Sequence, residues 1–125
     1  MDIILYGIPN CDTVRKARAW LVDHDVAYRF HDFRKDGVSR ELIAGWLAAV
    51  PWQSLVNTRG TTWRALPQQQ RESVVDADSA IALMLASPSV IKRPVLAASG
   101  VAQVGFATDV YEKIFDGPAG NQWRP

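Results

Sequence analysis

Residues 3–12 read Ile3-Ile4-Leu5-Tyr6-Gly7-Ile8-Pro9-Asn10-Cys11-Asp12. The first four residues are an apolar run with the length of a short buried strand, and the glycine, proline and asparagine that follow indicate a turn. An amphipathic pattern begins near Asp12, which places Cys11 in the first turn of a helix. Unpaired backbone N–H groups and the positive end of the helix dipole favour a thiolate over a thiol at such a position.

Cys11 is the only cysteine among the 125 residues. Its position alone leaves two interpretations open, a reactive nucleophile or a small buried apolar residue. In either case the chain can form no intramolecular disulfide, no thiolate-rich metal site and no two-cysteine redox cycle of its own. We therefore expect a reducing, cytoplasmic setting and no bound metal.

The length of the chain fits one domain that can bury a core without disulfides or metal ions. Lys and Arg number 14 and Asp and Glu 13, for a net charge of +1. This balance argues against a nucleic-acid partner and against an anionic membrane surface. The N-terminus lacks the pattern of a signal peptide, and no apolar stretch approaches the roughly 20 residues that span a bilayer, so we expect a soluble protein.

The first 38 residues predict a βαβ unit. A strand over 2–7 is followed by a helix over 12–23, and residues 26–33 alternate apolar and polar side chains, as in a strand with one buried face. A crossover helix of this length makes the two strands parallel neighbours. The apolar face of the helix is expected to comprise Val14, Ala17, Leu21 and Val22.

Residues 39–88 predict a helical insert. Ser39 is a candidate N-cap for a helix that ends before Pro51, and residues 51–67 are expected to form a short helix and a loop around two tryptophans. A further helix is expected to begin near Asp76 and to stop at Ser87-Pro88.

The chain then returns to β structure. Val95–Ala98 and residues 101–106 are predicted strands of a hairpin that turns at Ser99-Gly100. A last helix over 107–116 is expected to direct Val110, Ile114 and Phe115 inward, before a tail over 117–125. The prediction is a single domain, with a core of residues 1–38 and 89–116.

The complete order is β-α-β, helical insert, β-β-α, with a cysteine after the first strand and Pro94 immediately before the third. This order indicates an α/β fold of the thioredoxin-like class. An X-Pro bond that enters a strand beside the candidate nucleophile is a plausible cis peptide, because proline lowers the cost of the cis form. We predict a cis bond between Arg93 and Pro94.

Three segments in this order resemble the glutaredoxin-coupled arsenate reductase family. The similarity covers residues 2 to about 116 and is strongest to an arsenate-reductase-related bacterial subgroup, the YffB-like proteins. The segments are Tyr6-Gly7-Ile8-Pro9-Asn10-Cys11-Asp12-Thr13-Val14-Arg15-Lys16-Ala17, Asn57-Thr58-Arg59-Gly60 and Ile91-Lys92-Arg93-Pro94.

The resemblance implies roles for three residues. In arsenate reductases of this family the cysteine attacks arsenate, and arginines from the middle loop and from the segment before the cis-proline hold the oxyanion. Those roles correspond to Cys11, Arg59 and Arg93, beside Pro94. Guanidinium groups are suited to these roles, because they bind oxyanions in bidentate geometry and also stabilise a nearby thiolate. Arg15 is a further candidate, for which a solvated helix-face cation is the competing interpretation.

The sequence departs from this family pattern at two places. The arsenate reductases have another arginine on a strand after the cis-proline, whereas residues 101–106 are apolar except for Gln103. The related Spx regulators carry a Cys-x-x-Cys switch, whose second cysteine corresponds to Val14 here. The first departure argues against arsenate specificity, and the second excludes the Cys-x-x-Cys switch.

With one cysteine, the chemistry open to the chain is monothiol. A thiolate attacks a disulfide or an oxyanion, and an outside thiol must resolve the product. The sequence thus favours a monothiol reductase with glutathione as co-substrate, no bound cofactor, and glutathione or a glutaredoxin as partner. Two alternatives stay open. One is an arsenate reductase coupled to glutathione and glutaredoxin, and the other is a Spx-like regulator that binds a protein such as RNA polymerase.

Overall fold

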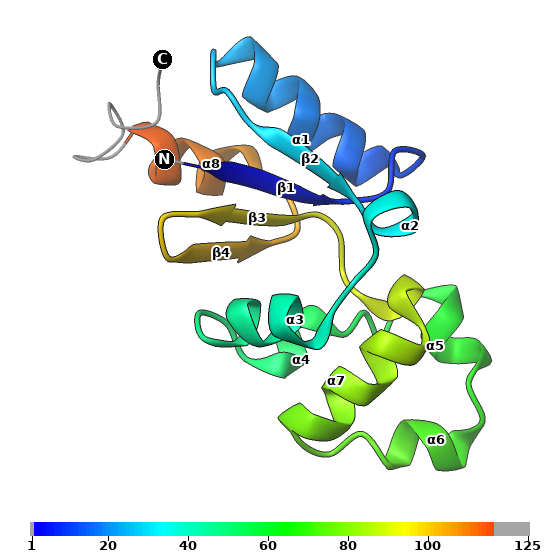
Figure 1. The fold of residues 1–125 in the computed structure, drawn as a ribbon. Helices are drawn as coiled ribbons and strands as arrows, with labels where there is room; N and C mark the ends of the chain where they lie inside the picture. Colours follow the sequence, from blue (N-terminus) through cyan, green and yellow to red (C-terminus); the bar gives the residue numbers. More distant parts are fainter. Residues whose placement is uncertain (1, 117–125) are drawn as a thin grey trace. The chain divides into compact units, whose positions relative to one another are not determined.

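The structure is a computed structural model that describes residues 2–116 (Figure 1); the predicted tail over 117–125 lies outside this range. The chain forms two compact units. The first unit consists of two segments of the chain, one that ends at Asp36 and one that begins at Arg93. The second unit comprises Gly37–Lys92. Within the described range, no helix combines the length and the apolar character needed to cross a membrane.

The first unit is built on a four-stranded sheet with the order β2-β1-β3-β4. Its strands are β1 (Ile3–Gly7), β2 (Arg29–Asp32), β3 (Val95–Ala98) and β4 (Val101–Val104). β1 pairs with β2 in parallel and with β3 in antiparallel orientation, and β3 pairs with β4 in antiparallel orientation. The predicted parallel pair and the thioredoxin-like α/β arrangement are confirmed.

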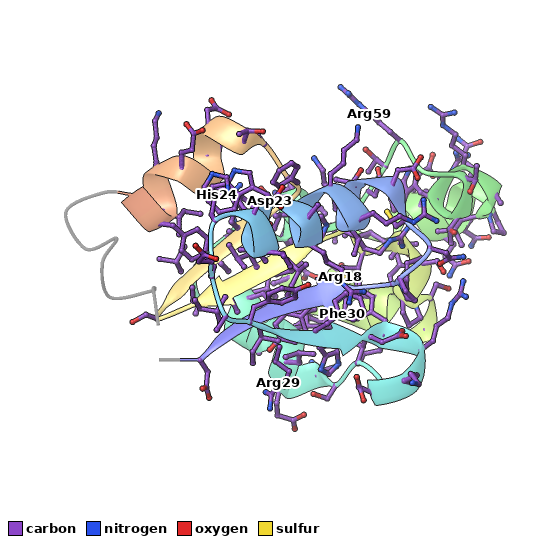
Figure 2. All side chains as sticks on the ribbon, turned by 90° about the horizontal axis from the view of Figure 1, so that it is seen from above. Arg18, Asp23, His24, Arg29, Phe30 and Arg59 are labelled. Carbon is purple, nitrogen blue, oxygen red and sulfur yellow. The ribbon has the colours of Figure 1, made fainter. Side chains whose placement is uncertain are left out.

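Helices α1 (Asp12–Asp23) and α8 (Thr108–Asp116) lie on the same face of this sheet (Figures 1 and 2). The alternation of side chains along β1 and β3 directs one set of apolar residues toward both helices. The resulting core contains Ile3, Leu5, Ala17, Trp20, Leu21, Val26, Leu96, Ala98, Tyr111 and Phe115.

The predicted apolar face of α1 is wrong at one position. Val22 is 63% exposed, whereas Trp20 is buried. Trp20 follows Ala17 by nearly one turn and continues the buried stripe, while Val22 lies about 100° around the helix from Leu21. In α8, Phe115 is buried as predicted, and Tyr111 is a buried residue that the sequence pattern did not indicate.

Two strands are shorter than predicted. β2 begins at Arg29 instead of residue 26, because the chain before it still bonds to the end of α1, where the Val26 N–H donates to the Leu21 carbonyl at 2.9 Å. After β2, the Asp32 carboxylate accepts the Arg34 N–H at 2.8 Å, and the short helix α2 (Phe33–Asp36) begins. β4 ends before Gly105, whose φ of 81° lies in the left-handed region. The Gly105 N–H instead donates to the Pro94 carbonyl at 2.8 Å.

The second unit is helical. It contains α3 (Arg40–Leu47), α4 (Trp52–Leu55), α5 (Thr61–Ala65), α6 (Gln68–Glu72), α7 (Ala77–Ala86) and the 3₁₀ turn η1 (Pro88–Val90). The predicted cap at Ser39 is confirmed, since its hydroxyl accepts the Leu42 N–H at 3.1 Å. Asp76 caps α7 through a reciprocal capping box with Ser79. The short helix α6 was not predicted.

Candidate active site

Cys11 is the N-cap residue of α1. Its backbone is extended, with φ −113° and ψ 128°, and its carbonyl accepts the Arg15 N–H at 2.9 Å. The chain reaches this position because β1 ends at Gly7 and residues 8–11 connect it to the helix. The thiol is half-buried and free of any disulfide. The predicted position of the cysteine, between strand and helix, is confirmed.

The Cys11 sulfur faces several hydrogen-bond donors that stabilise its charged form. Partial burial raises the pKa of the thiol, but the Val14 N–H, the Arg93 guanidinium and the Thr13 N–H oppose this by hydrogen bonding, and the charge of Arg93 adds to them. The net effect is a pKa below the ordinary thiol value. These contacts favour the thiolate form of Cys11.

Arg93 reaches Cys11 because of the strand pairing. β3 runs antiparallel to β1 with Val95 opposite Tyr6, so the residues just before β3 lie beside the end of β1 from which the Cys11 loop departs. The Arg93–Pro94 peptide bond is cis, as predicted. Pro94 is buried, and its carbonyl is held by the Gly105 N–H. The structure thus brings Cys11, Arg93 and Pro94 together in the first unit.

Arg15 forms an ion pair with Asp12 in the first turn of α1. Both side chains are exposed, at 58% and 86% of their surfaces. Arg15 thus has a carboxylate partner within its own helix, and its predicted contact with a substrate anion stays a prediction.

Arg59 lies in the second unit, between α4 and α5. Its backbone N–H donates to the Asn57 side-chain oxygen at 3.2 Å, and the Gly60 N–H donates to the Asn57 carbonyl at 3.3 Å. These bonds define a tight turn from which the exposed Arg59 side chain extends outward (Figure 2). Its role in anion binding stays a prediction.

Two contributors to the site are backbone amides, which the predicted helix start after Cys11 indicated as a group without identifying the residues. The backbone amides of Thr13 and Val14 act on the sulfur, although their residue types carry no catalytic signal. The helix start after Cys11 was the only indication of such donors. Among residues 2–116, no group of three or more His, Cys, Asp or Glu side chains is placed to hold a metal ion.

A family model described as the ArsC family matches residues 6–114, which include Cys11, Arg93 and Pro94. The chain belongs to the ArsC family. The resemblance inferred from the three sequence segments is thereby confirmed, and with it the fold class.

Two solved structures are similar to this ArsC family member at 50% sequence identity. One is a protein named YFFB. The alignment covers 87% of this chain and 95% of the YFFB chain, with a TM-score of 0.82. The other is an arsenate reductase (ArsC) related protein from Brucella melitensis, which covers 92% of this chain and 95% of its own with a TM-score of 0.72. A global transcriptional regulator Spx from Streptococcus pyogenes is 28% identical over 86% of this chain and 80% of its own.

Proposed function

We propose that this ArsC family member is a glutathione-dependent monothiol reductase of the cytoplasm, with Cys11 as its nucleophile. The placement of the Cys11 sulfur carries the proposal. At the start of α1 the Val14 N–H and the Arg93 guanidinium hydrogen bond to the sulfur and lower the pKa of the thiol despite partial burial. A lowered pKa increases the fraction present as thiolate, which attacks disulfides far faster than the thiol does. No bound cofactor is needed, because the electrons come from glutathione as co-substrate.

The reaction proceeds in two exchanges. The Cys11 thiolate attacks a disulfide sulfur of a glutathione mixed disulfide, which forms a bond between Cys11 and the glutathionyl sulfur and releases the substrate as a thiolate. A second glutathione thiolate, or a glutaredoxin thiolate, then attacks this intermediate. Cys11 leaves as thiolate, and glutathione disulfide (or the glutathionylated glutaredoxin) is the oxidised product. Because Cys11 is the only cysteine, this second exchange requires the outside thiol.

Arg93 has two roles in this proposal. Its guanidinium stabilises the attacking thiolate, and it stabilises the same sulfur again when Cys11 is the leaving group. Glutathione carries carboxylates, for which Arg59 is the proposed second binding residue, with Arg15 as a weaker candidate because it is paired with Asp12.

The direct test is the covalent intermediate. After incubation with glutathione disulfide, intact mass spectrometry should show one glutathionyl adduct on the protein and none on the Cys11→Ser variant. Steady-state reduction of bis(2-hydroxyethyl) disulfide by glutathione should likewise be lost in Cys11→Ser. An adduct that persists in the variant, or a wild-type protein that forms none, would contradict the proposal.

Arg59 allows a second test of the same proposal. Arg59→Met should raise the KM for glutathione several-fold, since it removes one charge-assisted contact to a carboxylate. It should leave the pH profile of Cys11 alkylation unchanged, because no interaction of Arg59 with the sulfur contributes to its pKa. Arg71→Met, in α6, is the matched control and should change neither quantity. An unchanged KM in Arg59→Met would remove Arg59 from the site.

Arsenate reduction is the second candidate, favoured by the similarity to the arsenate reductase related protein of Brucella melitensis. It would use the same nucleophile on an oxyanion. Against it, the polar residue of β4 is Gln103, a neutral side chain whose amide donates to the Val104 carbonyl at 3.2 Å. Turnover of arsenate with glutathione and glutaredoxin would decide in its favour.

A regulatory role is the third candidate, favoured by the similarity to the regulator Spx. In that case the chain would bind a protein such as RNA polymerase, and the Cys11 thiolate would serve as a sensor. Co-purification of polymerase subunits with the wild-type chain, together with failure of the reductase assay, would support it.

A further inference from the structure

Gly7 is the buried last residue of β1, four positions before Cys11. Its φ lies outside the left-handed region, so the backbone conformation does not require glycine. The constraint is spatial. A Cβ at position 7 would lie 2.8 Å from Cγ2 and 3.5 Å from Cγ1 of Val14, the third residue of α1.

Neither partner in this contact can move away easily. Gly7 is paired with Asp32 of β2, which fixes its backbone in the sheet. Further along the helix, Ala17 and Leu21 are fully buried and anchor α1 against the sheet. The Val14 side chain is itself 0% exposed. Because valine is β-branched, its side-chain rotamer in a helix is nearly fixed, so the methyl groups cannot turn aside.

A side chain at position 7 would therefore displace the first turn of α1. That turn carries the Val14 N–H, which hydrogen bonds to the Cys11 sulfur. We propose that Gly7 and Val14 form a matched pair that holds this turn against β1 and so makes Gly7 a positioning residue for the Cys11 nucleophile. The inference deepens the proposed function and rests on it only where that function requires a Cys11 thiolate.

The test is the pH dependence of iodoacetamide alkylation, which reports on Cys11 because the chain has no other cysteine. Gly7→Ala should move the profile to higher pH. On its acidic side the rate should fall about tenfold, which is the effect of losing one hydrogen bond to a charged group. Far-ultraviolet circular dichroism and thermal unfolding should be recorded for each variant, to verify that it is folded.

Three variants separate positioning from general damage. In Gly7→Ala/Val14→Ala the removed methyl groups make room for the new Cβ. Val14→Ala alone is the reference for this double variant, so Gly7→Ala should shift the wild-type profile but leave the Val14→Ala profile where it is. Gly45→Ala in α3 makes the same glycine-to-alanine change where a Cβ would meet nothing within 4 Å, and it should have no effect.

Several results would overturn the inference. One is a wild-type profile in Gly7→Ala, and another is a double variant whose profile differs from that of Val14→Ala. If Gly7→Ala does not fold, the double variant decides, since it must fold and match Val14→Ala. Alkylation needs no turnover, so the two proposals fail separately. If Gly7→Ala shifts the alkylation profile of the wild-type protein but not that of Val14→Ala, and the wild-type protein has no reductase activity, only the proposed function is contradicted. If the wild-type protein is an active reductase and Gly7→Ala does not change the profile, only the positioning role is contradicted.

Discussion

At the scale of single residues, the pKa of the Cys11 thiol results from a competition between solvent loss and hydrogen bonding. Partial burial acts against the thiolate, and the Val14 N–H, the Arg93 guanidinium and the Thr13 N–H act for it. The donors prevail because a hydrogen bond to a charged group contributes about 1.5–3 kcal/mol, and a half-buried sulfur retains part of its hydration. Arg93 is the only one of these donors that a side-chain substitution can remove.

Arg93→Met should raise the pKa of the Cys11 thiol and lower kcat/KM of the reductase by about tenfold or more, since one charge-assisted hydrogen bond is lost. Arg93→Lys should have a smaller effect, because it keeps the charge but not the planar fork. Alkylation profiles and reductase kinetics measure both quantities. Arg29→Met, at the start of β2, is the control; equal effects of Arg93→Met and this control would contradict a specific role for Arg93.

Residue types and the family resemblance together indicated part of this site. The cysteine and the cis-proline were predicted from the residues themselves, since a thiol at a helix start and an X-Pro bond before a strand are recognisable signals. Arg93 was predicted from the resemblance, and its guanidinium suits the role. The pairing of Arg15 with Asp12 and the fit of Gly7 against Val14 were not predicted. Both depend on side-chain geometry that spacing in the sequence does not determine.

At the scale of helices and strands, the long periodic elements were predicted well and the short ones were not. α1 and α7 have strong start signals and clear apolar patterns. The helix α6 spans five residues and buries none of them, so it leaves no periodic signal. β2 was predicted too long, because the alternation of residues 26–33 does not reveal the local bonds at either end of the strand. The Val26 N–H bonds to the Leu21 carbonyl before the strand, and the Asp32 carboxylate accepts the Arg34 N–H after it.

The hairpin between β3 and β4 gives a test at this scale. Ala98 pairs with Val101, and the two turn residues Ser99 and Gly100 have φ values of 46° and 81°. Positive φ at both positions is typical of a type I′ turn, whose twist matches that of the strands. This turn determines which residues of β4 face those of β3.

Gly100→Ala should lower the free energy of unfolding by about 1 kcal/mol, because alanine disfavours the left-handed conformation. Nothing lies within 4 Å of the added Cβ, so no steric clash contributes. Gly45→Ala, in the exposed part of α3, should instead raise the unfolding free energy by about 0.5–1 kcal/mol. Urea unfolding of both variants measures the difference; a loss of stability in both, or in neither, would contradict the turn assignment.

At the scale of the whole molecule, the order of elements was the most reliable prediction. A βαβ half, a helical segment and a ββα half follow from the change between helical and strand periodicity along the chain, and the observed sheet order β2-β1-β3-β4 agrees with it. The proposed role of Arg59 cannot be derived in the same way. It belongs to the second unit, and a local pattern does not determine contacts between segments so distant in sequence.

The stability of the folded chain should depend on the ionisation of Cys11. The thiol pKa is lower in the folded protein than its ordinary value, so the folded state releases this proton more readily than the unfolded chain. The resulting stabilisation is fully present above the ordinary thiol pKa of about 8.5 and is lost as pH falls through the folded pKa. Urea unfolding across this window should show stability rising with pH for wild type relative to Cys11→Ser. A difference between the two proteins that does not change with pH would contradict the lowered pKa.

The central claim is that Cys11 is a stabilised thiolate, and the most direct test is the rate of its alkylation by iodoacetamide as a function of pH in the wild-type protein. With one cysteine in the chain, the profile has a single origin. If the thiolate is stabilised, the midpoint of the profile lies clearly below the ordinary thiol pKa of about 8.5. A midpoint at or above that value would show that the donors around the sulfur do not stabilise its charge, and it would contradict the proposed thiol chemistry.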